Sequence, residues 1–228
     1  LYFPTEIPTR GAAFWNGLAA VEVPDLALDL MQPFVGDTIP KGRLREILEE
    51  TLAFEFPLVE VSPGVFALEL YHGPTMAFKD VGSRFMARCL GHFSSGTDQQ
   101  ITVLVATSGD TGGAVADALY GLEAVDNLVF FPKGSITERQ RRQMTTLGGN
   151  IYAFEVNGDF DVCQALAKRL LGDKDFARTL FGDPARFTSA NSISVGRLIP
   201  QAVYPFFAYS RIAAYDEPMI ASVPSGNF

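Results

Sequence analysis

The chain has 228 residues, of which 47% are hydrophobic and 19% charged, and its formal net charge is −8. This composition is typical of a globular protein with a packed core and excludes an intrinsically disordered chain. The negative charge and the lack of a basic block argue against a nucleic-acid partner, and no apolar run is long enough to predict a membrane span. Two histidines and two distant cysteines are too few for a metal centre, and the cysteines are expected to be reduced, buried thiols in a cytoplasmic protein.

The first 60 residues mix proline-rich turns with helical stretches, and the clearest helical pattern covers 44–54. A short strand is expected at 65–70, followed by a turn and an amphipathic helix over 80–93. The chain starts without an initiator methionine and stops at 222–228 inside an expected strand-to-loop junction. We therefore interpret it as a piece of a longer protein.

From residue 101 onwards, strand and helix patterns alternate. Short apolar runs predict strands at 101–106, 127–131, 151–156, 187–190 and 219–223. Helices are expected over 114–122 and 160–171, through Arg197, and from the capping box at 135–138 to Leu147. Ser135 to Glu138 matches a capping box, and Asp159 is expected to cap the helix that follows it. Apolar strands that alternate with helices predict an α/β fold, in which helices cover both faces of a parallel sheet.

Lys79 is the most informative residue for function. It stands between the turn at 72–75 and the start of an expected helix, directly after Met76, Ala77 and Phe78. Burial among apolar residues and the positive end of a helix dipole both lower the pKa of a lysine amine. An unprotonated amine forms a Schiff base with an aldehyde. From these residues alone, an ordinary lysine with a packed stem and a solvated head is the favoured interpretation, because surface lysines are common.

Three loops follow expected strands, at the position where parallel α/β sheets bind ligands. Residues 107–113 combine glycines, hydroxyls and N–H groups that suit a carboxylate or phosphate, although Asp110 would also serve as a simple helix cap. Residues 189–197 end in Arg197, whose fork suits a phosphate, although this segment taken alone favours a surface arginine on a capped helix. Residues 224–227 would form an anion-binding nest or an ordinary turn.

A reactive lysine, anion-binding loops and no metal cluster together indicate a cofactor that carries an aldehyde and a phosphate, namely pyridoxal 5'-phosphate. With these loops assembled, the chain resembles the threonine synthase family of pyridoxal-phosphate enzymes, which has the tryptophan-synthase-β-like fold (fold type II). The segments that carry the resemblance are 3–8, 72–80, 106–112, 132–134, 191–193 with Arg197, and 224–228. The chain departs from the family at Ser194, where members often carry asparagine.

The resemblance implies a domain organisation and a set of site residues. It implies two αβα domains: an N-terminal segment over 1–70, the large domain over 71–95 and 189–228, and the small domain over 96–188. The residues implied to bind the cofactor are Phe78, Lys79, Asp110, Thr111, Ser225, Gly226 and Asn227, with Lys79 also the catalytic acid and base. The residues implied to bind the substrate are Thr107, Ser108, Gly109, Asp110, Thr111, Asn191, Ser192 and Arg197.

The implied reaction converts O-phospho-L-homoserine and water to L-threonine and phosphate. The substrate is then the small-molecule partner, and the assembly is a monomer or a homodimer. A phospho-lyase of the same lineage, which releases a 2-oxo acid, is a close alternative, because it needs the same lysine and the same grip on phosphate. A non-catalytic protein that keeps the fold as a binding module is a further alternative.

Overall fold

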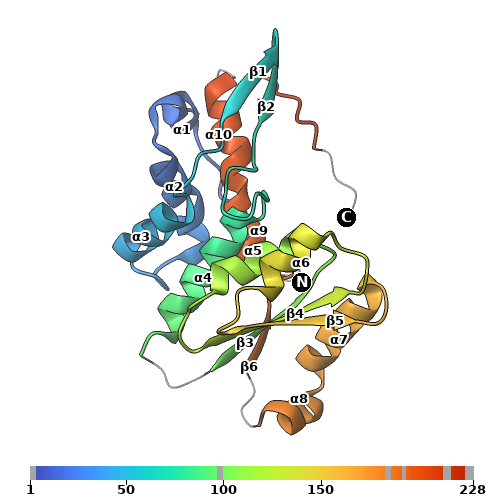
Figure 1. Cartoon of the computed structure of the whole chain (residues 1–228). Helices are drawn as coiled ribbons and strands as arrows, with labels where there is room; N and C mark the ends of the chain where they lie inside the picture. Colours follow the sequence, from blue (N-terminus) through green and yellow to red (C-terminus); the bar gives the residue numbers. More distant parts are fainter. Residues whose placement is uncertain (1–3, 97–99, 183–185, 192–193, 213–216, 224–228) are drawn as a thin grey trace.

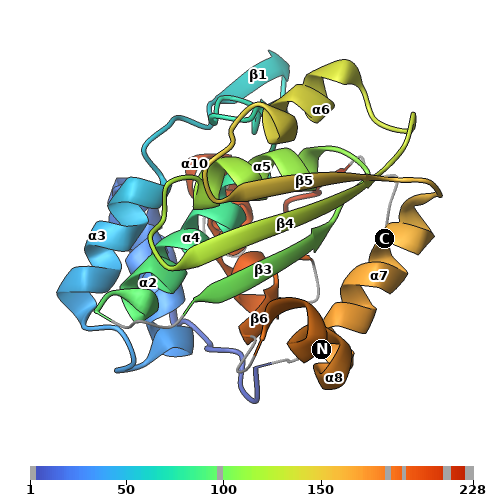
Figure 2. The same ribbon diagram turned by 60° about the horizontal axis from the view of Figure 1, so that its bottom comes forward.

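A parallel four-stranded sheet forms the centre of the computed structural model, which describes residues 4–96, 100–182, 186–191, 194–212 and 217–223. Its strands run side by side in the order β5-β4-β3-β6 (Figure 2). Their bounds are β3 (Ile101–Ala106), β4 (Val125–Pro132), β5 (Ile151–Val156) and β6 (Arg186–Ser189). Each neighbouring pair is parallel, so the predicted α/β fold with a parallel sheet is confirmed.

Alternate residues of β3 face different helical layers. Val103 and Val105 pack in one core with helices α4 (Asp80–Ser94), α5 (Asp110–Leu119) and α6 (Glu138–Thr145). Leu104 and Ala106 pack on the other face with α7 (Phe160–Gly172). A strand buried on both faces must be apolar throughout, and for this reason the run 101–106 is apolar at nearly every position.

The N-terminal residues form a second, helical unit above the sheet (Figure 1). It contains α1 (Ala12–Gly17), η1 (Leu18–Ala20), α2 (Val23–Val35), α3 (Lys41–Thr51) and the antiparallel hairpin of β1 (Leu58–Ser62) with β2 (Val65–Leu68). After α9 (Val195–Leu198) and η2 (Ile199–Ala202), the chain returns to this unit as α10 (Val203–Ile212), which packs on α2.

Helix α4 belongs to both cores. Val81 and Phe85 pack among the N-terminal helices, whereas Met86 and Ala87 pack against the sheet. The helix therefore joins the two units, and Lys79 stands at its first turn. The division into domains at 70, 95 and 188 stays a prediction.

Several local expectations are wrong. The run 219–223 is irregular, because an apolar segment without a pairing strand forms no ladder, and Ile220 is 96% exposed. Helix α5 starts at Asp110 and not at residue 114. The capping box joins Thr137 to Gln140, two residues later than the sequence suggests, because Ser135 is still part of the turn after β4. Neither β1 nor α8 (Lys174–Phe181) was predicted.

Both cysteines are free, Cys163 fully buried and Cys89 partly buried. Within the described ranges, none of the helices combines the length and the hydropathy that crossing a bilayer requires.

Candidate active site

The turn before Lys79 is tied together by the buried carboxylate of Asp80. One oxygen of Asp80 accepts a hydrogen bond from the backbone N–H of Thr75 at 3.0 Å, and the other accepts one from the Thr75 hydroxyl. Gly73 leaves room for this arrangement, because a Cβ there would lie 2.4 Å from Asp80 Oδ2. Burial raises the pKa of Asp80, and the bonds from Thr75 oppose that shift.

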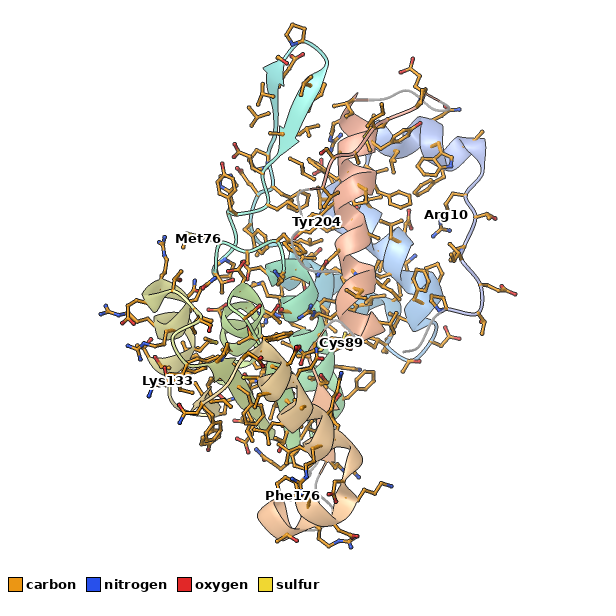
Figure 3. All side chains as sticks on the ribbon, turned by 90° about the vertical axis from the view of Figure 1, so that its right-hand side faces the viewer. Arg10, Met76, Cys89, Lys133, Phe176 and Tyr204 are labelled. Carbon is orange, nitrogen blue, oxygen red and sulfur yellow. The ribbon has the colours of Figure 1, made fainter. Side chains whose placement is uncertain are left out.

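Lys79 is the N-cap residue of α4, and its side chain is 21% exposed. Its Nζ lies 4.4 Å from the centre of the Phe78 ring. The Phe78 carbonyl accepts a hydrogen bond from the Tyr204 hydroxyl at 2.8 Å, so α10 holds the peptide next to the lysine. Figure 3 labels Met76 in this turn and Tyr204 on α10.

Three influences set the pKa of Lys79. Burial is the largest and lowers it, as the sequence predicts; the carboxylate of Asp110 raises it, and the guanidinium of Arg197 lowers it. Lys79 Nζ and Asp110 Oδ2 are 4.0 Å apart. The net result is an amine that loses its proton more readily than an ordinary lysine.

The loop after β3 brings Asp110 opposite Lys79. Thr107 is buried, and its hydroxyl oxygen accepts hydrogen bonds from the backbone N–H groups of Gly109 and Gly112 at 3.0 and 2.9 Å. Its hydroxyl therefore shapes the loop, whereas Ser108 and Asp110 are exposed on it. The Asp110 carboxylate does not cap α5, which has Gly109 as its N-cap.

Asn191 and Arg197 come from the segment after β6. The Asn191 amide pairs with both main-chain groups of Ala106, accepting at 3.0 Å and donating at 2.6 Å, and so extends the contact between β3 and β6. Arg197 is 2% exposed, and its Nη1 donates to the Ala190 carbonyl at 2.7 Å. Burial lowers the pKa of Arg197 to about 10, so it stays protonated at neutral pH.

The predicted site thus has a described part and a part that lies outside the described residues. Lys79, Asp110 and Arg197 come together from three separate elements, and Phe78, Gly109 and Thr111 adjoin them in sequence. Four predicted residues lie outside the described ranges: Ser192, Ser225, Gly226 and Asn227. Their contacts stay predictions.

Sequence reasoning missed two residues that support this site. Tyr204 is 126 residues from its partner Phe78. Gln140 donates from its Nε2 to Asp110 Oδ1 at 2.8 Å across 30 residues. The only local signal for Gln140 is its place as the third helical residue in a Thr-x-x-Gln capping box.

Comparison with known proteins gives matches along the whole chain. Residues 52–194 match the family model described as pyridoxal-phosphate dependent enzyme, and residues 1–52 match that described as threonine synthase N terminus. The threonine synthase of Escherichia coli (strain K12) is 40% identical over 229 residues, which cover 100% of this chain and 52% of that protein. The threonine synthase of Eremothecium gossypii is 32% identical over 250 residues, covering 100% of this chain and 48% of that protein.

Two solved structures are similar in fold. The crystal structure of threonine synthase from Escherichia coli aligns with a TM-score of 0.83 at 40% identity, covering 92% of this chain and 47% of that one. The X-ray structure of PLP-bound threonine synthase from Brucella melitensis has a TM-score of 0.83 at 35% identity, covering 95% and 47%. The chain spans about half the length of the relatives that it matches.

Proposed function

The chain belongs to the pyridoxal-phosphate dependent enzymes, and from this premise we propose that the full-length protein converts O-phospho-L-homoserine and water to L-threonine and phosphate. The observation that carries the proposal is the setting of Lys79, a largely buried amine at a helix start with one carboxylate and one guanidinium acting on it. The likeness to threonine synthases along the whole chain supports the choice of reaction.

The residues present fit the cofactor. Its aldehyde requires an amine that is unprotonated near neutral pH, and burial lowers the pKa of Lys79 in that direction. We assign Lys79 as the residue that holds the cofactor, with Phe78, Asp110 and Thr111 beside it. Ser225, Gly226 and Asn227 are proposed for the cofactor phosphate. When bound, pyridoxal phosphate supplies an electron sink for negative charge on a substrate carbon.

Proton transfer falls to Lys79. Its lowered pKa places the amine closer to neutral pH than an ordinary lysine, which is what a group that both takes and returns protons requires. The Asp110 carboxylate opposes this shift only in part, because 53% of its side chain is exposed and water screens its charge.

Arg197 is proposed to hold the phosphate of the substrate. A buried fork that stays charged at neutral pH binds a phosphate more strongly than an exposed one, because less water competes for it. As the phosphate leaves, negative charge grows on its oxygens, and a fixed cation stabilises that charge. Thr107, Ser108, Gly109, Asn191 and Ser192 are proposed to complete the substrate site.

A product assay on the full-length protein tests the proposal. Pyridoxal phosphate and O-phospho-L-homoserine are supplied, and released phosphate is compared with L-threonine and with 2-oxobutyrate. Lys79→Ala is the blank, and Lys168→Ala, which removes an exposed lysine on α7, is the matched control. We expect threonine equal to phosphate in the parent and in Lys168→Ala, and neither product with Lys79→Ala.

Two outcomes contradict the proposal in different ways. Phosphate with 2-oxobutyrate and no threonine would make the protein a phospho-lyase and leave Lys79 in place. Undiminished turnover by Lys79→Ala would show that Lys79 takes no part in the reaction.

A further inference from the structure

Gln140 connects the start of α6 to the carboxylate that faces Lys79. Its Nε2 donates to Asp110 Oδ1 at 2.8 Å, while its Oε1 accepts from the backbone N–H of Thr137 at 3.0 Å. These two bonds fix the orientation of the Gln140 amide, with its nitrogen toward Asp110 and its oxygen toward Thr137. The opposite orientation would set an oxygen against the carboxylate and an NH₂ group against an N–H donor. The cap of α6 therefore directs the donor end of Gln140 toward Asp110.

Gly109 provides the space for this contact. The residue has φ 151°, and a Cβ there would lie 2.5 Å from Gln140 Nε2. Because Gly109 directly precedes Asp110, its missing side chain lets the amide reach the carboxylate from α6. The contact therefore requires a residue without a Cβ at position 109, and the positive φ of this residue also favours glycine.

The same bond limits how closely Asp110 approaches the lysine. One carboxylate oxygen is taken by Gln140, and the other stops 4.0 Å from Lys79 Nζ, which is beyond a direct hydrogen bond. Asp110 is half exposed, so packing alone does not fix its side chain. Without Gln140, attraction between opposite charges would draw the carboxylate onto the amine.

We propose that Gln140 is a positioning residue, which holds the Asp110 carboxylate opposite Lys79 but short of a direct hydrogen bond with its amine. The inference rests on the proposed function only in taking Lys79 as the reactive amine. A carboxylate bonded directly to that amine would keep it protonated and less reactive toward an aldehyde. Gln140 acts through Asp110 and is not itself placed at the reacting atoms.

The titration of Lys79 provides a readout that needs neither substrate nor cofactor. The charged groups that act on its amine are Asp110 from α5 and Arg197 from α9. The pKa of Lys79 is measured in the cofactor-free full-length protein by trace acetylation with acetic anhydride at a series of pH values, followed by mass spectrometry of the Lys79 peptide. With Gln140→Ala we expect a rise of about 0.2–0.7 pKa unit, the range that an exposed ion pair supplies.

Three further variants separate positioning from general damage. Thr137→Ala removes the hydroxyl that caps α6 and that also donates to Gln140 Oε1, but it keeps the Gln140 amide and the backbone N–H that Oε1 accepts from. It is expected to raise the Lys79 pKa less than Gln140→Ala does. Gln140→Glu keeps the acceptor for the cap but repels Asp110, and is expected to raise that pKa at least as much as Gln140→Ala. In an Asp110→Asn background, Gln140→Ala is expected to have no effect.

An unchanged Lys79 pKa in both Gln140→Ala and Gln140→Glu would overturn the inference. So would an equal rise in Thr137→Ala, or a rise that persists in the Asp110→Asn background. These results are independent of the product assay. The expected rise without threonine formation would overturn the proposed function alone, and threonine formation without the rise would overturn this inference alone.

Discussion

We expect that a methyl group added at Gly82 disturbs the candidate active site, because it would displace the segment that carries Arg197. It lies in the first turn of α4, three residues after Lys79, and faces the segment that carries Arg197. A Cβ on Gly82 would lie 2.2 Å from the main-chain oxygen of Arg197 and 2.7 Å from Gln201 Nε2. The glutamine can move aside, but the oxygen belongs to backbone, so α9 as a whole would have to shift. Gly82→Ala should therefore displace Arg197 as well as strain the packing.

Two opposing terms determine the stability change. Alanine is favoured over glycine inside a helix by roughly 0.5–1 kcal/mol, whereas overpacking a close contact costs about 1–3 kcal/mol. We expect overpacking to win, so that Gly82→Ala destabilises the protein by about 1–2 kcal/mol. Gly91→Ala is the matched control in the same helix, because its Cβ would meet only Leu122 Cδ2, at an ordinary contact distance of 3.6 Å. That variant is expected to be neutral or slightly stabilised.

Thermal unfolding and release of phosphate from O-phospho-L-homoserine, the proposed substrate, measure the two consequences on the full-length protein. Gly82→Ala should unfold at a lower temperature and show a raised KM, while Gly91→Ala should unfold at the same or a higher temperature with KM unchanged. If Gly82→Ala were as stable as Gly91→Ala, the close packing of α4 on α9 would be refuted. If Gly82→Ala lost stability but kept its KM, the proposed grip of Arg197 on the substrate would be refuted.

Three further predictions concern buried groups. Lys79→Met should raise the unfolding temperature of the cofactor-free protein at neutral pH. The pKa of Lys79 in the folded protein is below its ordinary 10.5, so the folded state loses stability as the pH falls through that lowered value. The gain from Lys79→Met should therefore shrink as the pH rises toward 10.5, and a pH-independent gain would contradict the burial argument. Tyr204→Phe leaves the Phe78 carbonyl without its donor and should cost about 1–3 kcal/mol in urea unfolding, whereas an unchanged midpoint would show that water replaces the hydroxyl. Burial raises the pKa of Cys89 to about 12 and also raises that of Cys163, so iodoacetamide should modify neither thiol at pH 8 until denaturant is added, and rapid labelling of the native protein would contradict this.

The sheet was predictable because strands buried on both faces are composed almost entirely of apolar residues. Strands β3 and β4 are covered on both faces, so nearly every residue between 101 and 106 and between 127 and 131 is apolar. Strand β1 lacks this signal, because it belongs to a hairpin in which most of its residues are exposed. The expected strand at 219–223 shows the opposite error, since apolar composition does not supply the partner that a strand needs.

The position of Lys79 was also predictable, whereas most of its supporting contacts were not. A turn followed by a helical pattern locates a lysine at a helix start from neighbouring residues alone. The bonds from Tyr204 to Phe78, from Asn191 to Ala106 and from Gln140 to Asp110 span 126, 85 and 30 residues. Such contacts follow from how the helices and strands pack, which no local pattern encodes.

The contrast between the carboxylates of Asp80 and Asp110 explains why the pKa of the Lys79 amine is lowered. Asp80 is 1% exposed, and Thr75 occupies both of its oxygens, so it shapes the turn. Asp110 faces the amine but stays half in water, where an ion pair contributes little. Had Asp110 been buried as deeply as Asp80, its attraction would have offset the desolvation of Lys79 and opposed the lowering of its pKa. Desolvation prevails because the opposing charge is hydrated and set 4.0 Å away.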